Sequence, residues 1–165
     1  MQISERLVEF RIIETNDKPF LKALYRSTRE LELSYTTMTE AEKDRFITQQ
    51  FNAQSQAYAL NYLCAVHRII RLGGNDIGRL IVNRADDHMR VIDLSLLPEY
   101  RGRGIGSDIL RALQHEAQGG KVPIHLMAII NSPVVRLYQK LGFKITGQET
   151  TRYSMSWHPP EFREI

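Results

Sequence analysis

Short segments in which apolar residues alternate with polar ones, or run together, predict the β-strands of this chain. These segments cover residues 7–13, 63–71, 77–83, 89–97, 122–129, 143–148 and 151–157. The sequence Gly73-Gly74-Asn75-Asp76 predicts a hairpin turn between the second and third segments. Asp86 and Asp87 predict a further turn before the fourth. The region from 63 to 97 is therefore expected to form consecutive strands joined by turns.

In other segments the apolar residues recur every three or four positions, which predicts amphipathic helices. These helices cover approximately residues 17–31, 39–55, 104–117 and 132–141. The apolar positions of the first helix include Phe20, Leu21, Leu24 and Leu31. Thr39 and Glu42 form a capping box at the start of the second helix, and Gly119 follows the third. The predicted order of elements is β-α-α-β-β-β-α-β-α-β-β, which indicates a mixed α/β domain.

A glycine-rich turn lies between the apolar run 91–97 and the helix whose amphipathic pattern begins near Ser107. Its sequence is Arg101-Gly102-Arg103-Gly104-Ile105-Gly106. Glycines let a backbone approach a pyrophosphate closely, and unpaired N–H groups at a helix N-terminus favour negative charge. Ser107 replaces the last glycine of the dinucleotide fingerprint, and no Walker loop is present, so these two phosphate loops are excluded. The turn indicates another phosphorylated carrier; a plain surface loop is the alternative.

A second informative segment covers residues 131–143 and predicts a short helix. Ser132 can cap this helix, Pro133 suits its first turn, and Gly142 ends it. Tyr138 falls on the apolar face of the helix. Taken alone, that position predicts a core aromatic residue rather than a reactive one.

Together, the two segments resemble the GNAT superfamily of N-acetyltransferases. The segment Pro98-Glu99-Tyr100-Arg101-Gly102-Arg103-Gly104-Ile105-Gly106 looks like the acyl-coenzyme A pyrophosphate loop of that family. The segment 131–143 looks like its Asn…Leu-Tyr-x-Lys-Leu-Gly-Phe signature. The resemblance is clear over about residues 75–157 and implies the GNAT fold, a mixed sheet in which strands 89–97 and 122–129 splay apart. The pantetheine arm of acetyl-coenzyme A would lie in that gap, bonded by unpaired backbone groups.

The resemblance also implies roles for individual residues. Backbone groups of Leu96 and Leu97 would bond the pantetheine and polarise the thioester carbonyl. The pyrophosphate would be held by backbone N–H groups of Arg101, Gly102, Arg103, Gly104, Ile105, Gly106 and Ser107, with help from the arginine side chains. Asn131 would contact the carrier arm, although its local sequence fits a cap or turn equally well. Tyr138 would act as the general acid that protonates the departing coenzyme A thiolate.

The general base is the point at which the chain departs from a common family pattern. Some members carry a glutamate twelve residues before the tyrosine, where this chain has Leu126. Asp93, on the strand 89–97, is the catalytic candidate in its place, although an aspartate in a salt bridge or at the surface explains the same residue. His125 is a weaker candidate, because strand alternation puts its side chain on the opposite face from Leu126.

Composition limits the classes of partner. The 165 residues have an ordinary hydrophobic and charged content, so residues 1–165 are expected to form a single domain. The net charge of +3 comes without a basic block, which argues against nucleic acid. The absence of a long apolar stretch and of a leader signal argues against a membrane and for a cytoplasmic protein. Cys64 is the only cysteine and the histidines are scattered, which predicts no metal site. The sequence also leaves room for a homodimer.

The function implied by the resemblance is an N-acetyltransferase. Acetyl-coenzyme A would be the co-substrate, and a primary amine of a small molecule, peptide or protein would attack its thioester directly. A non-catalytic acyl-coenzyme A-binding module is the alternative. The acceptor would be recognised within residues 17–75, which include the aromatic residues Tyr25, Phe46, Phe51, Tyr58 and Tyr62. Acidic residues there could attract a cationic amine, or could form a solvated helix face; they are Glu30, Glu32, Glu40 and Glu42.

Overall fold

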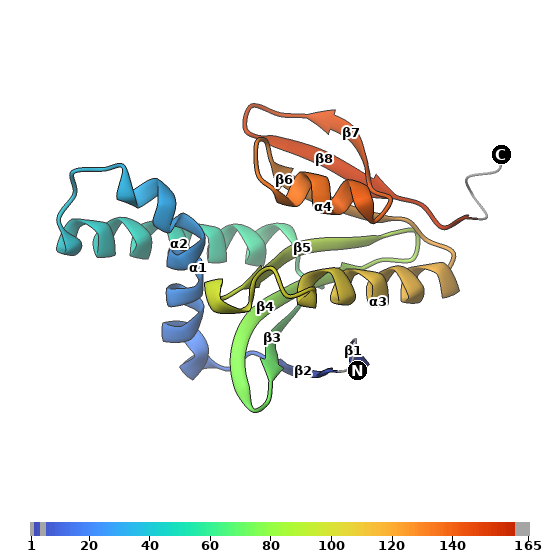
Figure 1. The fold of residues 1–165 in the computed structure, drawn as a ribbon, viewed down its shortest axis with the longest axis horizontal. Coiled ribbons are helices and arrows are strands. Elements are labelled where there is room, and N and C mark those ends of the chain that lie inside the picture. The colour runs from blue at the N-terminus through green and yellow to red at the C-terminus, as the bar shows by residue number, and fades with distance from the viewer. Residues whose placement is uncertain (1, 4–5, 161–165) are drawn as a thin grey trace.

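The structure, a computed structural model, describes residues 2–3 and 6–160 (Figure 1). Its strands are β1 (Gln2–Ile3), β2 (Arg6–Ile12), β3 (Val66–Leu72), β4 (Asn75–Arg84), β5 (Met89–Leu96), β6 (Ile124–Ile129), β7 (Lys144–Gln148) and β8 (Arg152–Trp157). Its helices are α1 (Lys18–Ser34), α2 (Glu40–Asn61), α3 (Ile105–Gly119) and α4 (Val134–Lys140), with short 3-10 helices η1 (Thr15–Asp17) and η2 (Pro98–Tyr100). From β2 onward, the order of strands and α-helices is the predicted one.

The strands form a mixed sheet in the order β1-β2-β3-β4-β5-β6-β8-β7. Every neighbouring pair is antiparallel except β5 and β6, which are parallel. These two strands pair only at their beginnings, Met89 with Ile124 and Arg90 with His125. Directly afterwards the register between β4 and β5 shifts by one residue at Ile92, a bulge of the kind that bends a strand. The predicted separation of the two strands is therefore confirmed.

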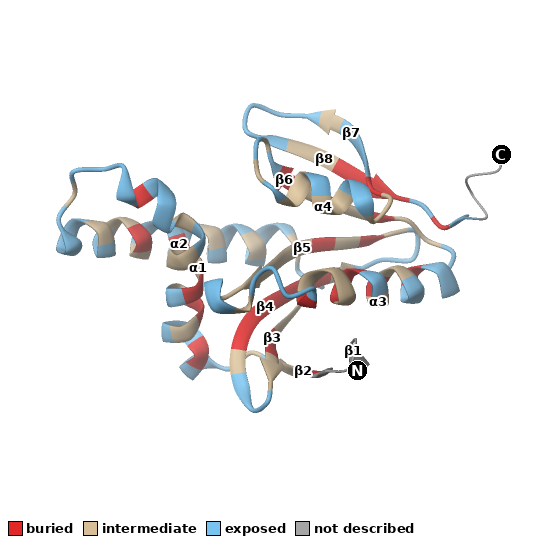
Figure 2. Cartoon of the chain, in the orientation of Figure 1, coloured by how far each residue is buried: buried red, intermediate tan, exposed pale blue. Residues whose placement is uncertain are grey.

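Helices cover both faces of the sheet (Figure 1). Ile69 and Ile70 are neighbours in β3 and are both completely buried, so each face carries its own core. One core lies under α3 and α4 and includes Leu80, Val91, Ile109, Leu113, Leu126 and Phe143. The other lies under α1 and α2 and includes Leu21, Phe51 and Ile69. Buried residues accordingly follow β4, β5 and the inner side of α3 (Figure 2).

The helices differ from the prediction in the end of α2 and in the residue that α1 buries. α2 continues to Asn61 rather than ending near Ser55, because the intervening residues are free of glycine and proline and include good helix formers. Leu31 was expected on the buried side of α1 but is 72% exposed. The last turns of α1 lie near the beginning of α2, away from the strands (Figure 1). Leu33, rather than Leu31, is buried there.

The strand boundaries differ where a turn is tighter than expected. Gly73 and Gly74 alone form the hairpin turn, with φ angles of 59° and 82° that suit a two-residue hairpin. Asn75 and Asp76 therefore belong to β4. The two-residue β1 was not predicted, because so short a segment has no periodicity to detect.

Candidate active site

A cleft of about 820 Å³ lies where β5 and β6 separate. Its walls come from β5 (residues 91–96), the turn before α3 (100–107), β6 (126–129) and the start of α4 (132–138). Among the residues singled out from the sequence, those that line it are Asp93, Leu96, Arg101, Gly102, Gly104, Ile105, Gly106, Ser107 and Tyr138. The fold thus brings three separate sequence segments to one space.

The glycine-rich turn presents unpaired N–H groups at this cleft. Gly102 and Gly104 have φ angles of 73° and 83°, which glycine adopts without strain. α3 begins at Ile105, and the N–H groups of Ile105, Gly106 and Ser107 have no acceptor among the described residues. The partial positive charge of the helix N-terminus adds to these donors. The turn therefore has the groups that the predicted pyrophosphate site requires.

The arginines of the turn are used differently from the prediction. Arg101 donates from Nε to the Leu96 carbonyl at 2.9 Å and from Nη2 to Ser27 Oγ at 3.1 Å. Its backbone N–H donates to the Pro98 carbonyl at 3.1 Å, so that N–H is not free for a pyrophosphate. Arg103 lies over the Tyr100 ring, 5.4 Å from its centroid, and does not line the cleft. Arg101 thus ties the turn to β5 and α1.

The β5 edge also corrects one predicted contact. The N–H of Leu97 donates to the Ile77 carbonyl at 2.8 Å, and Leu97 does not line the cleft. In an antiparallel pair the backbone groups of successive residues point alternately toward and away from the partner strand. Those of Leu94 and Leu96 therefore point away from β4, into the gap. Leu94, which the sequence analysis missed, takes the place that was expected for Leu97.

Tyr138 extends from α4 to the cleft. Its carbonyl accepts the N–H groups of Leu141 at 3.1 Å and Phe143 at 3.0 Å, which fixes the end of the helix. Its ring lies 5.9 Å from the Phe143 ring, centroid to centroid. Burial, and secondarily the negative charge of Asp93, raise the pKa of the Tyr138 hydroxyl to about 12. The hydroxyl consequently keeps its proton at neutral pH, which a general acid requires.

Asn131 lies outside the cleft. It is exposed and has a φ angle of 73°, a left-handed conformation that asparagine tolerates better than most residues. Ser132, Pro133 and Val134 line the cleft instead. Pro133, rather than the predicted Ser132, occupies the N-cap of α4, although Ser132 Oγ accepts the Val134 N–H at 3.4 Å. The backbone conformation of Asn131 fits the turn interpretation, and its contact with the carrier arm stays a prediction.

Asp93 lines the cleft as a member of a buried ionic network. Arg79, which is 5% exposed, forms an ion pair with one carboxylate oxygen of Asp93. Ser95 Oγ donates to the other oxygen at 2.5 Å, and Arg79 also donates to Gln54 Oε1 of α2 at 3.1 Å. The salt-bridge explanation considered from the sequence therefore holds, and Asp93 is still among the residues that line the cleft.

The other positions considered for a general base offer none in the cleft. Leu126 lines the cleft, but it is a buried core residue with no ionisable group. His125 projects from the opposite face of β6, as strand alternation predicts, and its Nδ1 lies 2.6 Å from Ser156 Oγ. His125 does not line the cleft, and burial lowers its pKa.

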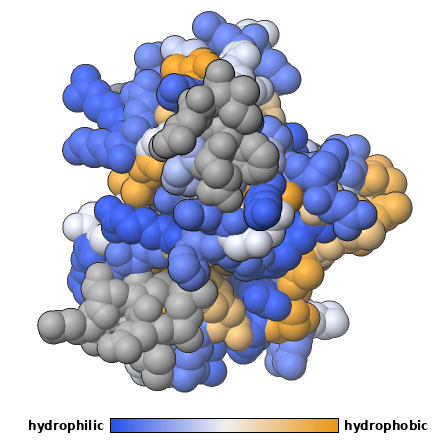
Figure 3. Space-filling view, turned by 90° about the vertical axis from the view of Figure 1, so that its right-hand side faces the viewer, coloured by the Kyte–Doolittle hydropathy of each residue, from blue (hydrophilic) through white to orange (hydrophobic). Residues whose placement is uncertain are grey.

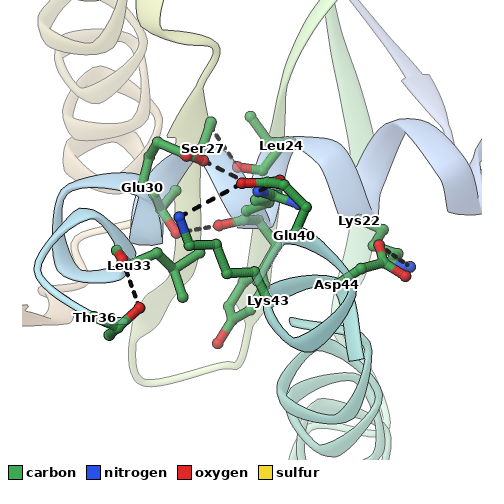
Figure 4. Close-up of polar contacts among 12 residues, drawn as sticks. Lys22, Leu24, Ser27, Glu30, Leu33, Thr36, Glu40, Lys43 and Asp44 are labelled. Atoms are coloured by element: carbon green, nitrogen blue, oxygen red, sulfur yellow. Dashed lines mark hydrogen bonds and ion pairs between the residues drawn. The ribbon is translucent and has the colours of Figure 1, made fainter. Parts of the chain in front are cut away.

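The acidic residues of α1 and α2 other than Glu42 have basic partners, and Figure 4 labels Glu30, Glu40 and Asp44 among them. Arg26 binds Glu30 at 3.4 Å and Glu40 at 2.9 Å. Glu32 is paired with an arginine of its own helix. Glu42 belongs to the capping box predicted at the start of α2, where its N–H donates to the Thr39 hydroxyl. These contacts favour the solvated-face interpretation over a cationic-acceptor site.

A second space, the side cavity, adjoins the cleft and measures about 200 Å³. It is lined by Tyr58, Tyr62, Arg90, Val91, Ile92, Met127, Ile129 and Arg152. Four of these residues also line the cleft, namely Val91, Ile92, Met127 and Ile129, so the two spaces meet at the gap between β5 and β6. Burial, and then the charge of Asp93, raise the pKa of Tyr58 to about 12. Both tyrosines were among the residues predicted near the acceptor, whereas neither arginine was predicted there.

Within residues 2–3 and 6–160, no helix is long and apolar enough to span a membrane. In the same part of the chain, no cluster of three or more His, Cys, Asp or Glu side chains is suited to hold a metal ion. On the face drawn in Figure 3, hydrophilic residues dominate and hydrophobic ones form small separate areas.

A family model described as an acetyltransferase (GNAT) domain matches residues 61–145, just over half of the chain. The chain therefore belongs to the GNAT acetyltransferase family, as the resemblance of its motifs predicted, and it is an acyltransferase. No curated protein matches the sequence.

Solved structures share the fold at low sequence identity. The PaiA N-acetyltransferase of Thermoplasma acidophilum, in complex with coenzyme A, is 18% identical with a TM-score of 0.67, over 92% of this chain and 99% of that one. An acetyltransferase of Thermus thermophilus is 17% identical with a TM-score of 0.63, over 92% and 96% of the two chains. A GNAT family acetyltransferase of Elizabethkingia anophelis, with acetyl-CoA bound, is 12% identical with a TM-score of 0.58, over 92% and 97%.

Proposed function

We propose that residues 1–165 act as a single N-acetyltransferase domain that moves an acetyl group from acetyl-coenzyme A to a primary amine. The observation that carries this proposal is the cleft between β5 and β6, which has unpaired N–H groups at the turn 100–107 and the Tyr138 hydroxyl on α4. Phosphate-binding donors and a protonated acid along one cleft match a phosphorylated thioester carrier and its leaving group.

Within the cleft, each group has a distinct task. The N–H groups at the start of α3 bind the pyrophosphate of the carrier. The backbone groups of Leu94 and the N–H of Leu96 point into the gap, where they bond the pantetheine amides and polarise the thioester carbonyl, whereas the Leu96 carbonyl already accepts from Arg101 Nε. Solved structures of the same fold with coenzyme A or acetyl-CoA bound support acetyl-coenzyme A as the co-substrate.

The reaction proceeds by direct attack of the neutral amine on the thioester carbonyl. A carbon–nitrogen bond forms, the carbon–sulfur bond breaks, and the Tyr138 hydroxyl gives its proton to the departing thiolate. A covalent acyl-enzyme is not needed, and Cys64 is absent from the residues that line the cleft and the side cavity. Water returns a proton to the Tyr138 oxygen, while the proton that the amine loses passes to a separate acceptor.

Asp93 is the acidic residue nearest to this chemistry, because it is the only Asp or Glu among the residues lining the cleft or the side cavity. Arg79 and Ser95 hold its carboxylate in place. We therefore assign Asp93 to orient the incoming amine and to receive its proton, directly or through a water molecule.

An acceptor screen tests the proposal against the alternative of a non-catalytic binding module. Primary amines, polyamines, amino acids and peptides are offered with acetyl-coenzyme A, and free coenzyme A thiol is measured. Thiol release that depends on the amine is the expected result. A protein that binds coenzyme A but transfers to no amine in the screen would support the binding module.

A further inference from the structure

The side cavity carries positive charge next to the place where an amine must react. Arg90 of β5 and Arg152 of β8 both line it. Across residues 2–3 and 6–160, neither guanidinium lies within 4.0 Å of a carboxylate oxygen. Arginine side chains that line a cavity without an acidic partner are available to bind an anion.

The strand register explains why Arg90 and Arg152 line the same cavity. Arg90 is paired with His125 and Arg152 with Ile129, on the two sides of β6. Every second residue of a strand shares a face, so His125, Met127 and Ile129 lie on one face of β6. Paired residues on neighbouring strands share that face, and both arginines therefore flank Met127, which lines the cavity.

Negative charge lies in the cleft at Asp93, the residue that follows Ile92, which lines both spaces. Asp93 lines the cleft, and its charge acts both on Tyr58 in the side cavity and on Tyr138 in the cleft. A molecule in the side cavity would thus have the Asp93 carboxylate on the side of the cleft, where the thioester is proposed to lie. The guanidinium groups of Arg90 and Arg152 would lie in the cavity itself. Such a charge distribution complements a molecule that carries an ammonium group and an anion.

We propose that the acetyl acceptor is a small primary amine that also carries a carboxylate or phosphate group, and that Arg90 and Arg152 bind this group. The proposal rests on the N-acetyltransferase function proposed above. The cavity of about 200 Å³ has the volume of roughly seven water molecules, which suits a small molecule. Tyr58 of α2 and Tyr62, which directly follows that helix, form its remaining polar wall.

Matched acceptors test the proposal. 4-Aminobutyrate is compared with butylamine, and 3-aminopropyl phosphate with propylamine, because the separated charges leave the amine basicity similar within each pair. We expect kcat/KM to be at least about ten-fold higher for the anionic member of one pair, the size expected for a hydrogen bond to a charged group. The better anion identifies which of the two groups the cavity receives.

Variants then locate the effect. Arg90→Gln and Arg152→Gln should each raise KM for the anionic acceptor by about ten-fold, with a much smaller change in kcat. Arg45→Gln serves as the matched control, since Arg45 is exposed near the opposite end of α2 from Tyr58. Circular dichroism and coenzyme A titration of each variant separate loss of acceptor binding from loss of fold or of cofactor binding.

Three results would overturn the proposal or separate it from the proposed function. A wild-type preference for the uncharged amine, or equal KM values in wild type and both cavity variants, overturns it. If wild type transfers to no amine, the proposed function fails. Calorimetry with 4-aminobutyrate and 3-aminopropyl phosphate then measures directly whether the side cavity binds the anionic group. Binding that weakens in Arg152→Gln but not in Arg45→Gln supports the anion site, and no binding of either molecule refutes it.

Discussion

Tyr138 is the residue on which the proposed chemistry depends most. Tyr138→Phe keeps the ring and its packing against Phe143 but removes the proton, so turnover should fall by about 10²- to 10⁴-fold while stability changes little. Coenzyme A affinity should stay within about a few-fold, because most of the carrier contacts are assigned to backbone groups. Steady-state kinetics, calorimetry and thermal unfolding of the variant measure these three quantities.

The raised pKa of Tyr138 also predicts the shape of the pH–rate profile. The hydroxyl is protonated below its pKa of about 12, so its acid function should be lost only as the pH rises toward that value. The rate should therefore increase with pH as the amine deprotonates, without a decline from Tyr138 below about pH 10, two units under that pKa. A phenylalanine variant that acetylates at the wild-type rate would instead make Tyr138 a core aromatic.

Asp93 raises a different question at the residue scale, because it has both a structural and a chemical assignment. Asp93→Asn should lower turnover at neutral pH, with partial recovery at higher pH where more of the amine is neutral. The same substitution leaves the buried Arg79 without its counter-ion, which typically costs about 3–5 kcal/mol of stability.

A double variant separates the two roles of Asp93. Asp93→Asn with Arg79→Met removes both charges, so much of the lost stability should return, as denaturant unfolding would measure. Turnover should remain low if the carboxylate handles the amine or its proton. Recovery of turnover together with stability would show that Asp93 serves only the fold.

The start of α3 is the element that should decide carrier binding. Gly106 lies in the first turn of α3, lines the cleft, and has open space where a Cβ would be placed. Gly106→Asp should therefore keep or raise the stability, since a helix favours an acidic residue in its first turn over glycine. Its charge should repel the pyrophosphate and lower coenzyme A affinity by about ten-fold or more at low salt, and less at high salt.

Gly106→Asn is the matched control for this element. It has nearly the shape of the aspartate without its charge, so it should retain most of the affinity measured by calorimetry. Gly104 is less suitable for the test, because its φ of 83° would add backbone strain to any side chain effect. Equal coenzyme A affinities for Gly106→Asp and Gly106→Asn would contradict the proposal that the start of α3 binds the pyrophosphate.

At the scale of the whole molecule, the cleft unites segments from both halves of the sheet, which predicts one cooperative unit. Residues 1–165 should unfold in a single thermal transition. Coenzyme A at about 100 times its Kd should stabilise the folded state by about 2.7 kcal/mol, which raises Tm by roughly 5–10 °C for a domain of this size. Calorimetric scans with and without coenzyme A measure this, and two separate transitions would contradict the single domain.

The sequence by itself determined the fold and identified the segments that form the candidate carrier site. Each strand or helix predicted from apolar periodicity has a counterpart, because burial on one face imposes a period that the sequence displays directly. The turn 101–106 could be identified as a phosphate-binding candidate for a similar reason, since positive φ angles and unpaired helix donors depend on adjacent residues. Tyr138 also reaches the predicted cleft.

The tertiary structure decided which backbone N–H groups are already hydrogen-bonded and which side chains are partners. Leu97 and Arg101 have committed N–H groups because of contacts with Ile77 and Pro98, and a motif does not record which donors are already used. The pairing of Asp93 with Arg79, and the meeting of Arg90 with Arg152, depend on strand register between segments far apart in the chain. Local periodicity contains no information on that register. The side cavity and its charge could therefore be recognised only in the tertiary structure.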